Sequence, residues 1–158
     1  MLRQNVIKLA LRIGVAMLLV TIVSGAPRQK KATEPSAVRE IRAVLDSQVG
    51  AWNRRDLEGF MRGYWHSPDL TFYSGGTTVS GWEETLGRYR NRYQSAGKEM
   101  GNLEFLDLKI ELLGPSAAFV RGRFHLKMTT GEQSGIFTLT FRKFADGWKI
   151  IHDHTSTA

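Results

Sequence analysis

Apolar residues recur at helical spacing in three segments of the first part of the chain. The first segment begins at Ser36, a candidate N-cap, and runs to about Asn53. The side chains that share one face of this predicted helix are Val38, Ile41, Leu45, Gln48 and Trp52. This spacing is typical of a helix that packs one side against a core.

Two shorter helices are predicted after the first. One follows a candidate cap at Asp56 and ends before Ser67, and its apolar side chains are Leu57, Phe60, Met61 and Tyr64. The other runs from Gly81 to about Gln94, behind a capping box at residues 80–83. One face of this third helix carries Trp82, Leu86, Tyr89 and Tyr93. A short β-like run, residues 70–73, separates the two helices.

Beyond residue 105 the period of the pattern changes from helical spacing to two. Apolar and polar residues alternate over residues 106–112, 118–126, 137–142 and 148–154. Turn residues separate these runs, among them the strong hairpin signal Asp146-Gly147. Helices followed by hairpin-linked strands predict an α+β domain, with the helices packed on one face of an antiparallel sheet.

The N-terminal 26 residues have the order of a secretion signal. Basic residues precede an apolar run at residues 13–23, and Ser24-Gly25-Ala26 forms a small-residue cleavage zone. The apolar run is shorter than the roughly 20 residues that span a bilayer, so a membrane association is expected only through an uncleaved signal. We therefore predict a signal at 1–26, a linker at 27–35 and one domain at 36–156, exported to the periplasm or secreted.

Charge and cysteine content narrow the possible partners. The formal net charge is +7, and three of the positive charges belong to residues 1–26. The remainder is mildly basic, with both signs interspersed, which is not the charge pattern of a nucleic-acid binder. The chain has no cysteine, so an oxidising compartment would impose no disulfide framework.

Three stretches of the chain resemble the SnoaL-like branch of the nuclear transport factor 2-like superfamily. They are AWNRRDLEGFMRGYW at 51–65, LTFYSGGTTVSGWEETLGRYRNRY at 70–93 and the closing hairpin FTLTFRKFADGWKIIHDHTS at 137–156. The end of the last stretch is also similar to the association domain of calcium/calmodulin-dependent kinase. The resemblance implies a cone, in which a curved sheet wraps the N-terminal helices around an open pocket. It also implies a homodimer formed through the outer sheet face.

Histidines form one group of candidate ligand-binding residues. His152 and His154 are two apart on a predicted strand, so both point to one side and Asp153 points to the other. One interpretation is a metal site with His125 as a third ligand. The other is a hydrogen-bonded structural or pocket-lining pair, which we favour because no acidic residue is evident on that side. We therefore expect no metal and no cofactor.

A cationic strand face is a second candidate. Arg121, Arg123 and His125 alternate with apolar residues, and an inward orientation would suit a carboxylate or phosphate ligand. An outward orientation would make them a solvated face or part of a dimer interface. The resemblance to the kinase association domain implies an inward Arg121, because a buried arginine at the matching position lines that pocket.

Aromatic and acidic residues form the third group. Tyr64, Trp65, Tyr73, Tyr89 and Tyr93 are a dense aromatic set, and we select Tyr64 and Tyr89 as those facing a cavity. The superfamily resemblance also implies a catalytic pair of an acidic base and a tyrosine donor, as in ketosteroid isomerases. Asp153 or Asp69 would be the base here, with Tyr89 or Tyr64 as donor.

Two functions from different classes are the main candidates at this point, and a purely structural dimerisation domain is a third. One is an exported binding domain that holds a small, anionic or aromatic molecule in a polar pocket. The expected ligand-binding residues are Tyr64, Trp65, Tyr73, Tyr89, Arg121, His125, His152 and His154. The alternative is an isomerase, cyclase or hydrolase in which Asp153 and Tyr89 act. A buried carboxylate in the cavity would favour the enzyme, and an inward Arg121 and His152 would favour binding.

Overall fold

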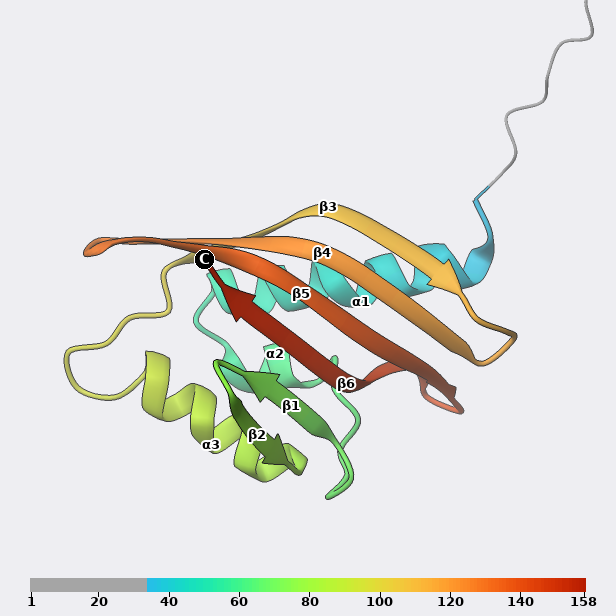
Figure 1. The fold of residues 1–158 in the computed structure, drawn as a ribbon, viewed down its shortest axis with the longest axis horizontal. Coiled ribbons are helices and arrows are strands. Elements are labelled where there is room, and N and C mark those ends of the chain that lie inside the picture. The colour runs from blue at the N-terminus through green and yellow to red at the C-terminus, as the bar shows by residue number, and fades with distance from the viewer. Residues whose placement is uncertain (1–33) are drawn as a thin grey trace, which may run out of the picture. The chain divides into compact units, whose positions relative to one another are not determined.

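The computed structural model describes residues 34–158, in which three helices precede and interrupt six strands (Figure 1). The helices are α1 (Ser36–Asn53), α2 (Leu57–Met61) and α3 (Trp82–Tyr93). The strands are β1 (Thr71–Ser74), β2 (Thr77–Ser80), β3 (Asn102–Leu112), β4 (Ala117–Met128), β5 (Gly131–Phe144) and β6 (Gly147–Thr157). The predicted signal at 1–26 and nearly all of the linker at 27–35 lie outside these residues.

The α+β prediction is confirmed, with one difference in the sheet. The strand order is β2-β1-β6-β5-β4-β3, and every neighbouring pair is antiparallel except β1 and β6, which are parallel. The β1–β2 hairpin accounts for the difference, because it joins the free edge of β6 from a distant part of the sequence. Strand β2 was not predicted, because the pattern indicates only the short β-like run at residues 70–73, whereas Gly75 and Gly76 form the turn of a hairpin in the structure.

The bounds of α1 and α3 agree with the sequence pattern, whereas α2 ends at Met61, short of the predicted end before Ser67. Two predicted caps are also wrong. Asp56 caps α2 as expected, accepting a hydrogen bond from the Gly59 amide at 2.7 Å. At α1 the cap position belongs to Pro35, and no side chain caps the helix. At α3 it belongs to Gly81, whose φ of 96° favours glycine, so the capping box at 80–83 does not form.

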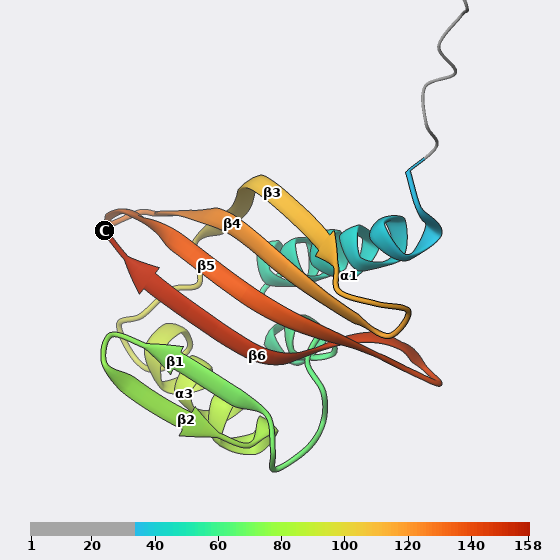
Figure 2. The ribbon, with the colours of Figure 1, turned by 45° about the vertical axis from the view of Figure 1, so that its right-hand side comes forward.

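The core lies between α1, α2 and one face of the sheet, which we call the inner face. Figures 1 and 2 show α1 across β3 to β6 and α3 beside the β1–β2 hairpin. On β4 and β5 every buried side chain lies at a predicted apolar position, so the alternation there identifies the inner face correctly. Among the described residues, no helix is long and apolar enough to cross a membrane.

Strand β3 departs from the predicted alternation. Its register against β4 shifts between Leu106 and Lys109, and Asp107 has a φ of 55°. Such a bulge reverses which side chains face inward. Leu103 and Phe105 therefore point inward before the shift, whereas Leu106, expected on the apolar side, is 44% exposed.

Candidate functional site

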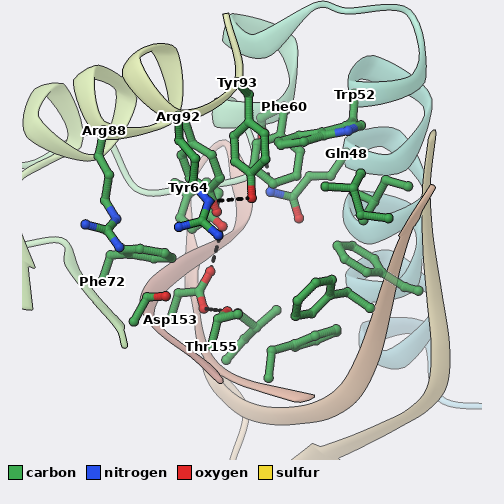
Figure 3. Close-up of a pocket in the computed structure, with 18 of the residues that line it drawn as sticks. Gln48, Trp52, Phe60, Tyr64, Phe72, Arg88, Arg92, Tyr93, Asp153 and Thr155 are labelled. Carbon is green, nitrogen blue, oxygen red and sulfur yellow. Dashed lines mark hydrogen bonds between the residues drawn. The ribbon is translucent and has the colours of Figure 1, made fainter. Parts of the chain in front are cut away.

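A cavity of about 90 Å³ lies between the helices and the inner face of the sheet (Figure 3). Its buried wall is largely apolar and aromatic, and comprises Trp52, Phe60, Phe72, Leu103, Leu126, Phe137 and Leu139. Its other end is bounded by more exposed residues, notably Arg92 on α3 and Thr157 at the end of β6. The cavity therefore has an apolar interior and an opening between α3 and the end of β6.

Asp153 is the charged side chain in the buried part of this cavity. It lies on β6 between two outward residues, so the alternation of the strand directs it inward. Its register partners on either side are Leu139 of β5 and Phe72 of β1. The surroundings are thus apolar, and the residue is only 3% exposed.

Two hydroxyl groups bind the Asp153 carboxyl. The Tyr64 hydroxyl donates to Oδ2 at 2.7 Å, and the Thr155 hydroxyl donates to Oδ1 at 2.9 Å (Figure 3). Burial raises the pKa of Asp153 to about 6, although these two hydrogen bonds oppose the rise. Both protonation states of Asp153 are therefore accessible close to neutral pH.

Tyrosines surround this carboxyl without ionising. Burial, reinforced by the charge of Asp153, raises the pKa of Tyr64 and of Tyr89 well above the usual value. Both hydroxyls therefore keep their protons and remain hydrogen-bond donors. The Tyr89 ring packs edge-on against Trp52 and Phe60, which holds α3 against the end of α1.

Two arginines of α3 line the cavity near its opening. Arg88 and Arg92 are one helical turn apart, and Figure 3 shows both side chains above Phe72 and Tyr64. The sequence pattern did not select either arginine as a site residue. Each arginine directly precedes a tyrosine that lines the cavity, Tyr89 or Tyr93. This adjacency is the sequence signal that could have placed both arginines beside the cavity.

The sequence-selected residues divide between the two sides of the sheet. Tyr64, Tyr89 and Asp153 line the cavity together. His152, His154 and Tyr73 lie on the opposite face, because the β6 alternation that turns Asp153 inward turns its neighbours outward. There the Thr71 hydroxyl is hydrogen-bonded to His152 Nδ1 at 2.7 Å, and the Tyr73 ring meets both histidines edge-on.

The expectation of an inward Arg121 is wrong. It lies on the outer face of β4, where it pairs with Glu111 at 3.4 Å, and His125 on the same face lies 3.1 Å from Glu132. The inner face of β4 is taken by Val120, Phe124 and Leu126, as the burial pattern requires.

Two further candidates also lie outside the cavity. Trp65 stacks on Phe144, with the Arg142 guanidinium over its ring. Asp69 is exposed in the turn before β1, where its amide binds the Ser67 hydroxyl. Over residues 34–158, no three or more His, Cys, Asp or Glu side chains gather as metal ligands.

Comparison with known proteins gives one family and many similar structures. The SnoaL-like domain family matches residues 41–158. An NTF-2 like protein of unknown function from Shewanella oneidensis is 38% identical, with a TM-score of 0.71 over 75% of this chain and 98% of that one. A ketosteroid isomerase-like protein from Erwinia carotovora atroseptica is 20% identical, with a TM-score of 0.63 over 78% and 98%. No curated protein matches the sequence significantly.

Proposed function

Because this chain belongs to the SnoaL-like domain family, we propose that its cavity binds a small, largely apolar molecule and that Asp153 exchanges a proton with it. The single observation that carries the proposal is the buried carboxyl, whose pKa is raised to about 6 in an apolar cavity. A group that titrates near the working pH serves well as a general acid or base. A structural neighbour described as ketosteroid isomerase-like has the same fold.

The neighbouring tyrosines support the same chemistry. Tyr64 holds Asp153 in one orientation through its 2.7 Å hydrogen bond. Tyr89 also lines the cavity, and its raised pKa keeps its hydroxyl group protonated. Proton removal beside a carbonyl group places negative charge on the carbonyl oxygen, and a hydroxyl donor in a dry site stabilises that charge. In this proposal Asp153 is the base and Tyr89 is the donor.

The size of the cavity limits the substrate. An apolar cavity of roughly 150 Å³ holds one benzene molecule, and this cavity measures about 90 Å³ with one open end. The enclosed space is therefore smaller than one that holds a whole ring, so a single-ring ligand would extend into the open end and a steroid does not fit. The proposed substrate class is a small carbonyl compound with an acidic C–H group next to the carbonyl.

Binding without chemistry is the second candidate. Both oxygens of Asp153 already accept a hydrogen bond, from Tyr64 and from Thr155. A carboxylate satisfied in this way can be a fixed polar contact for a ligand and take no proton from it. The two candidates differ in whether a bound carbonyl compound exchanges its hydrogen.

Hydrogen–deuterium exchange at carbon separates them. Cyclohexanone in deuterated buffer is followed by proton NMR with the wild type, with Asp153→Asn and with His154→Gln, an outer-face control on the same strand. We expect exchange catalysed by the wild type and by the control, and a loss of roughly 100-fold or more in Asp153→Asn. Ring compounds that bind without any catalysed exchange would contradict acid–base chemistry and leave the binding candidate.

Export and self-association are part of the proposal. Export is supported by the basic, apolar and small-residue order of residues 1–26, and cell fractionation tests it. A homodimer through the outer sheet face is supported by exposed apolar side chains there, such as Ile136. Sedimentation of the wild type and of Ile136→Glu tests the dimer.

A further inference from the structure

The opening of the cavity carries positive charge that the proton-transfer chemistry does not use. Arg88 and Arg92 both line the cavity from α3, and Arg92 also reaches the surface beyond the opening. Residues one helical turn apart project from the same side of a helix. The two guanidinium groups therefore face the same space, above an interior whose walls are apolar.

Neither group is neutralised by a carboxylate within residues 34–158. No ion pair there includes Arg88 or Arg92, and Glu84, one turn before Arg88, stays beyond ion-pair distance. On the opposite side of the same helix, Arg90 pairs with Glu58 at 2.7 Å. Helix α3 thus has its paired cation outside the cavity and two unpaired cations along it.

Aromatic rings hold both guanidinium groups in place. Arg88 lies over the Phe72 ring at 5.6 Å, and Arg92 lies over the Tyr93 ring at 5.6 Å. The Arg92 Nε also donates to the Tyr93 hydroxyl at 3.1 Å. A guanidinium has five N–H donors, so these contacts orient each group and leave most of its donors for a ligand.

We propose that the ligand of this cavity is a small carboxylate, with its apolar body inside and its carboxylate bound by Arg88 and Arg92. The planar fork of arginine matches a carboxylate in geometry and charge. The reverse orientation would bury the ligand charge beside Asp153, which is unfavourable because like charges repel in an apolar site. This inference rests on the proposed cavity binding and adds the class of ligand.

Benzoate and benzamide test this inference, because they share one ring and differ in the charge of the substituent. Calorimetric titration measures the binding of both compounds to the wild type, to the double variant Arg88→Gln/Arg92→Gln and to Arg90→Gln. The last variant removes a cation from the same helix outside the cavity. Circular dichroism and thermal unfolding of each variant establish that it folds as the wild type does.

We expect wild type and Arg90→Gln to bind benzoate roughly tenfold or more tightly than benzamide, and the double variant to lose this preference. Equal binding of the two compounds by the wild type would overturn the carboxylate inference alone. So would an equal loss of benzoate binding in Arg90→Gln, which indicates a general charge effect. Binding of neither compound would overturn the inference together with the proposed cavity function.

Discussion

The two faces of the sheet use the same strands for different purposes. The inner face of β4, β5 and β6 is apolar and contains one ionisable side chain in its buried part, Asp153. The outer face of the same strands carries Arg121, His125, His152 and His154, each within reach of a polar or aromatic neighbour. Titratable groups are therefore numerous where water is available and rare where it is excluded.

The difference between the two faces shows that burial is what raises the pKa of a carboxyl in this sheet. Glu111, an acid on the outer face, forms an exposed ion pair with Arg121. Exposed ion pairs contribute little to the free energy of unfolding. Asp153 is one residue from the outer face along β6, yet burial raises its pKa to about 6. A step of one residue along a strand thus separates a solvated charge from a buried carboxyl with a raised pKa.

The largest expected effect contrasts the two faces of β5. Leu139→Ala removes a buried inner-face side chain and leaves a larger cavity, so it should lower the free energy of unfolding by about 3 kcal/mol. Ile136→Ala, at a position 55% exposed on the outer face, should change it by no more than about 0.5 kcal/mol in the monomer. Denaturant unfolding of both variants measures the contrast, and equal losses would contradict the assignment of the faces.

The pH dependence of stability gives the next effect. Because the folded-state pKa of Asp153 is raised from 3.8 to about 6, folding binds a proton between these values. The contribution of Asp153 is full below pH 3.8 and is lost as the pH rises through about 6. Relative to Asp153→Asn, the wild type should lose roughly 3 kcal/mol over this interval.

Denaturant unfolding of wild type and Asp153→Asn from pH 3.5 to pH 7.5 isolates this contribution, because the other carboxyls are common to both proteins. His154→Gln serves as the control on the same strand and should keep the wild-type profile. A difference between wild type and Asp153→Asn that does not vary with pH would contradict a raised pKa.

The smallest expected effect is a change in the pKa of Asp153, tested by comparing two tyrosines on opposite faces. Tyr64→Phe removes a hydrogen bond that favours the ionised carboxyl, so the pKa of Asp153 should rise further, by roughly one unit. Tyr73→Phe removes a hydroxyl from the outer face, where the side chain is 39% exposed. It should leave that pKa unchanged. NMR titration of both variants tests this, and an unchanged pKa in Tyr64→Phe would show that the hydroxyl contributes nothing.

Local patterns predicted most of the fold. The helical spacing of Val38, Ile41 and Leu45 and the alternation in β4 and β5 identified the buried faces correctly, because each reflects contacts with a single core. The pairing of β1 with β6 was not predictable in this way, since it joins residues about 80 positions apart. The bulge at Asp107 was also not predicted. One inserted residue reverses the inward and outward alternation of the strand without a marked change in composition.

The site was predictable only in part. Asp153, Tyr64 and Tyr89 stood out as an acid and two tyrosines on elements expected to meet, but the sequence could not decide which side of β6 faces inward. Apolar residues occur on both sides of that strand, so its direction depends on its pairing with β1 and β5. Arg88 and Arg92 were missed as site residues because a charge on a helix is usually solvated.

The titration of Asp153 is the decisive test of the proposed proton transfer. The protein is labelled with ¹³C at the aspartate carboxyls, and Asp153→Asn assigns the resonance of Asp153. We expect a midpoint at about pH 6 for this resonance, above the ordinary value of roughly 3.9 for an aspartate. A midpoint near that ordinary value would show that the cavity does not tune the carboxyl, and the proposed proton transfer would lose its basis.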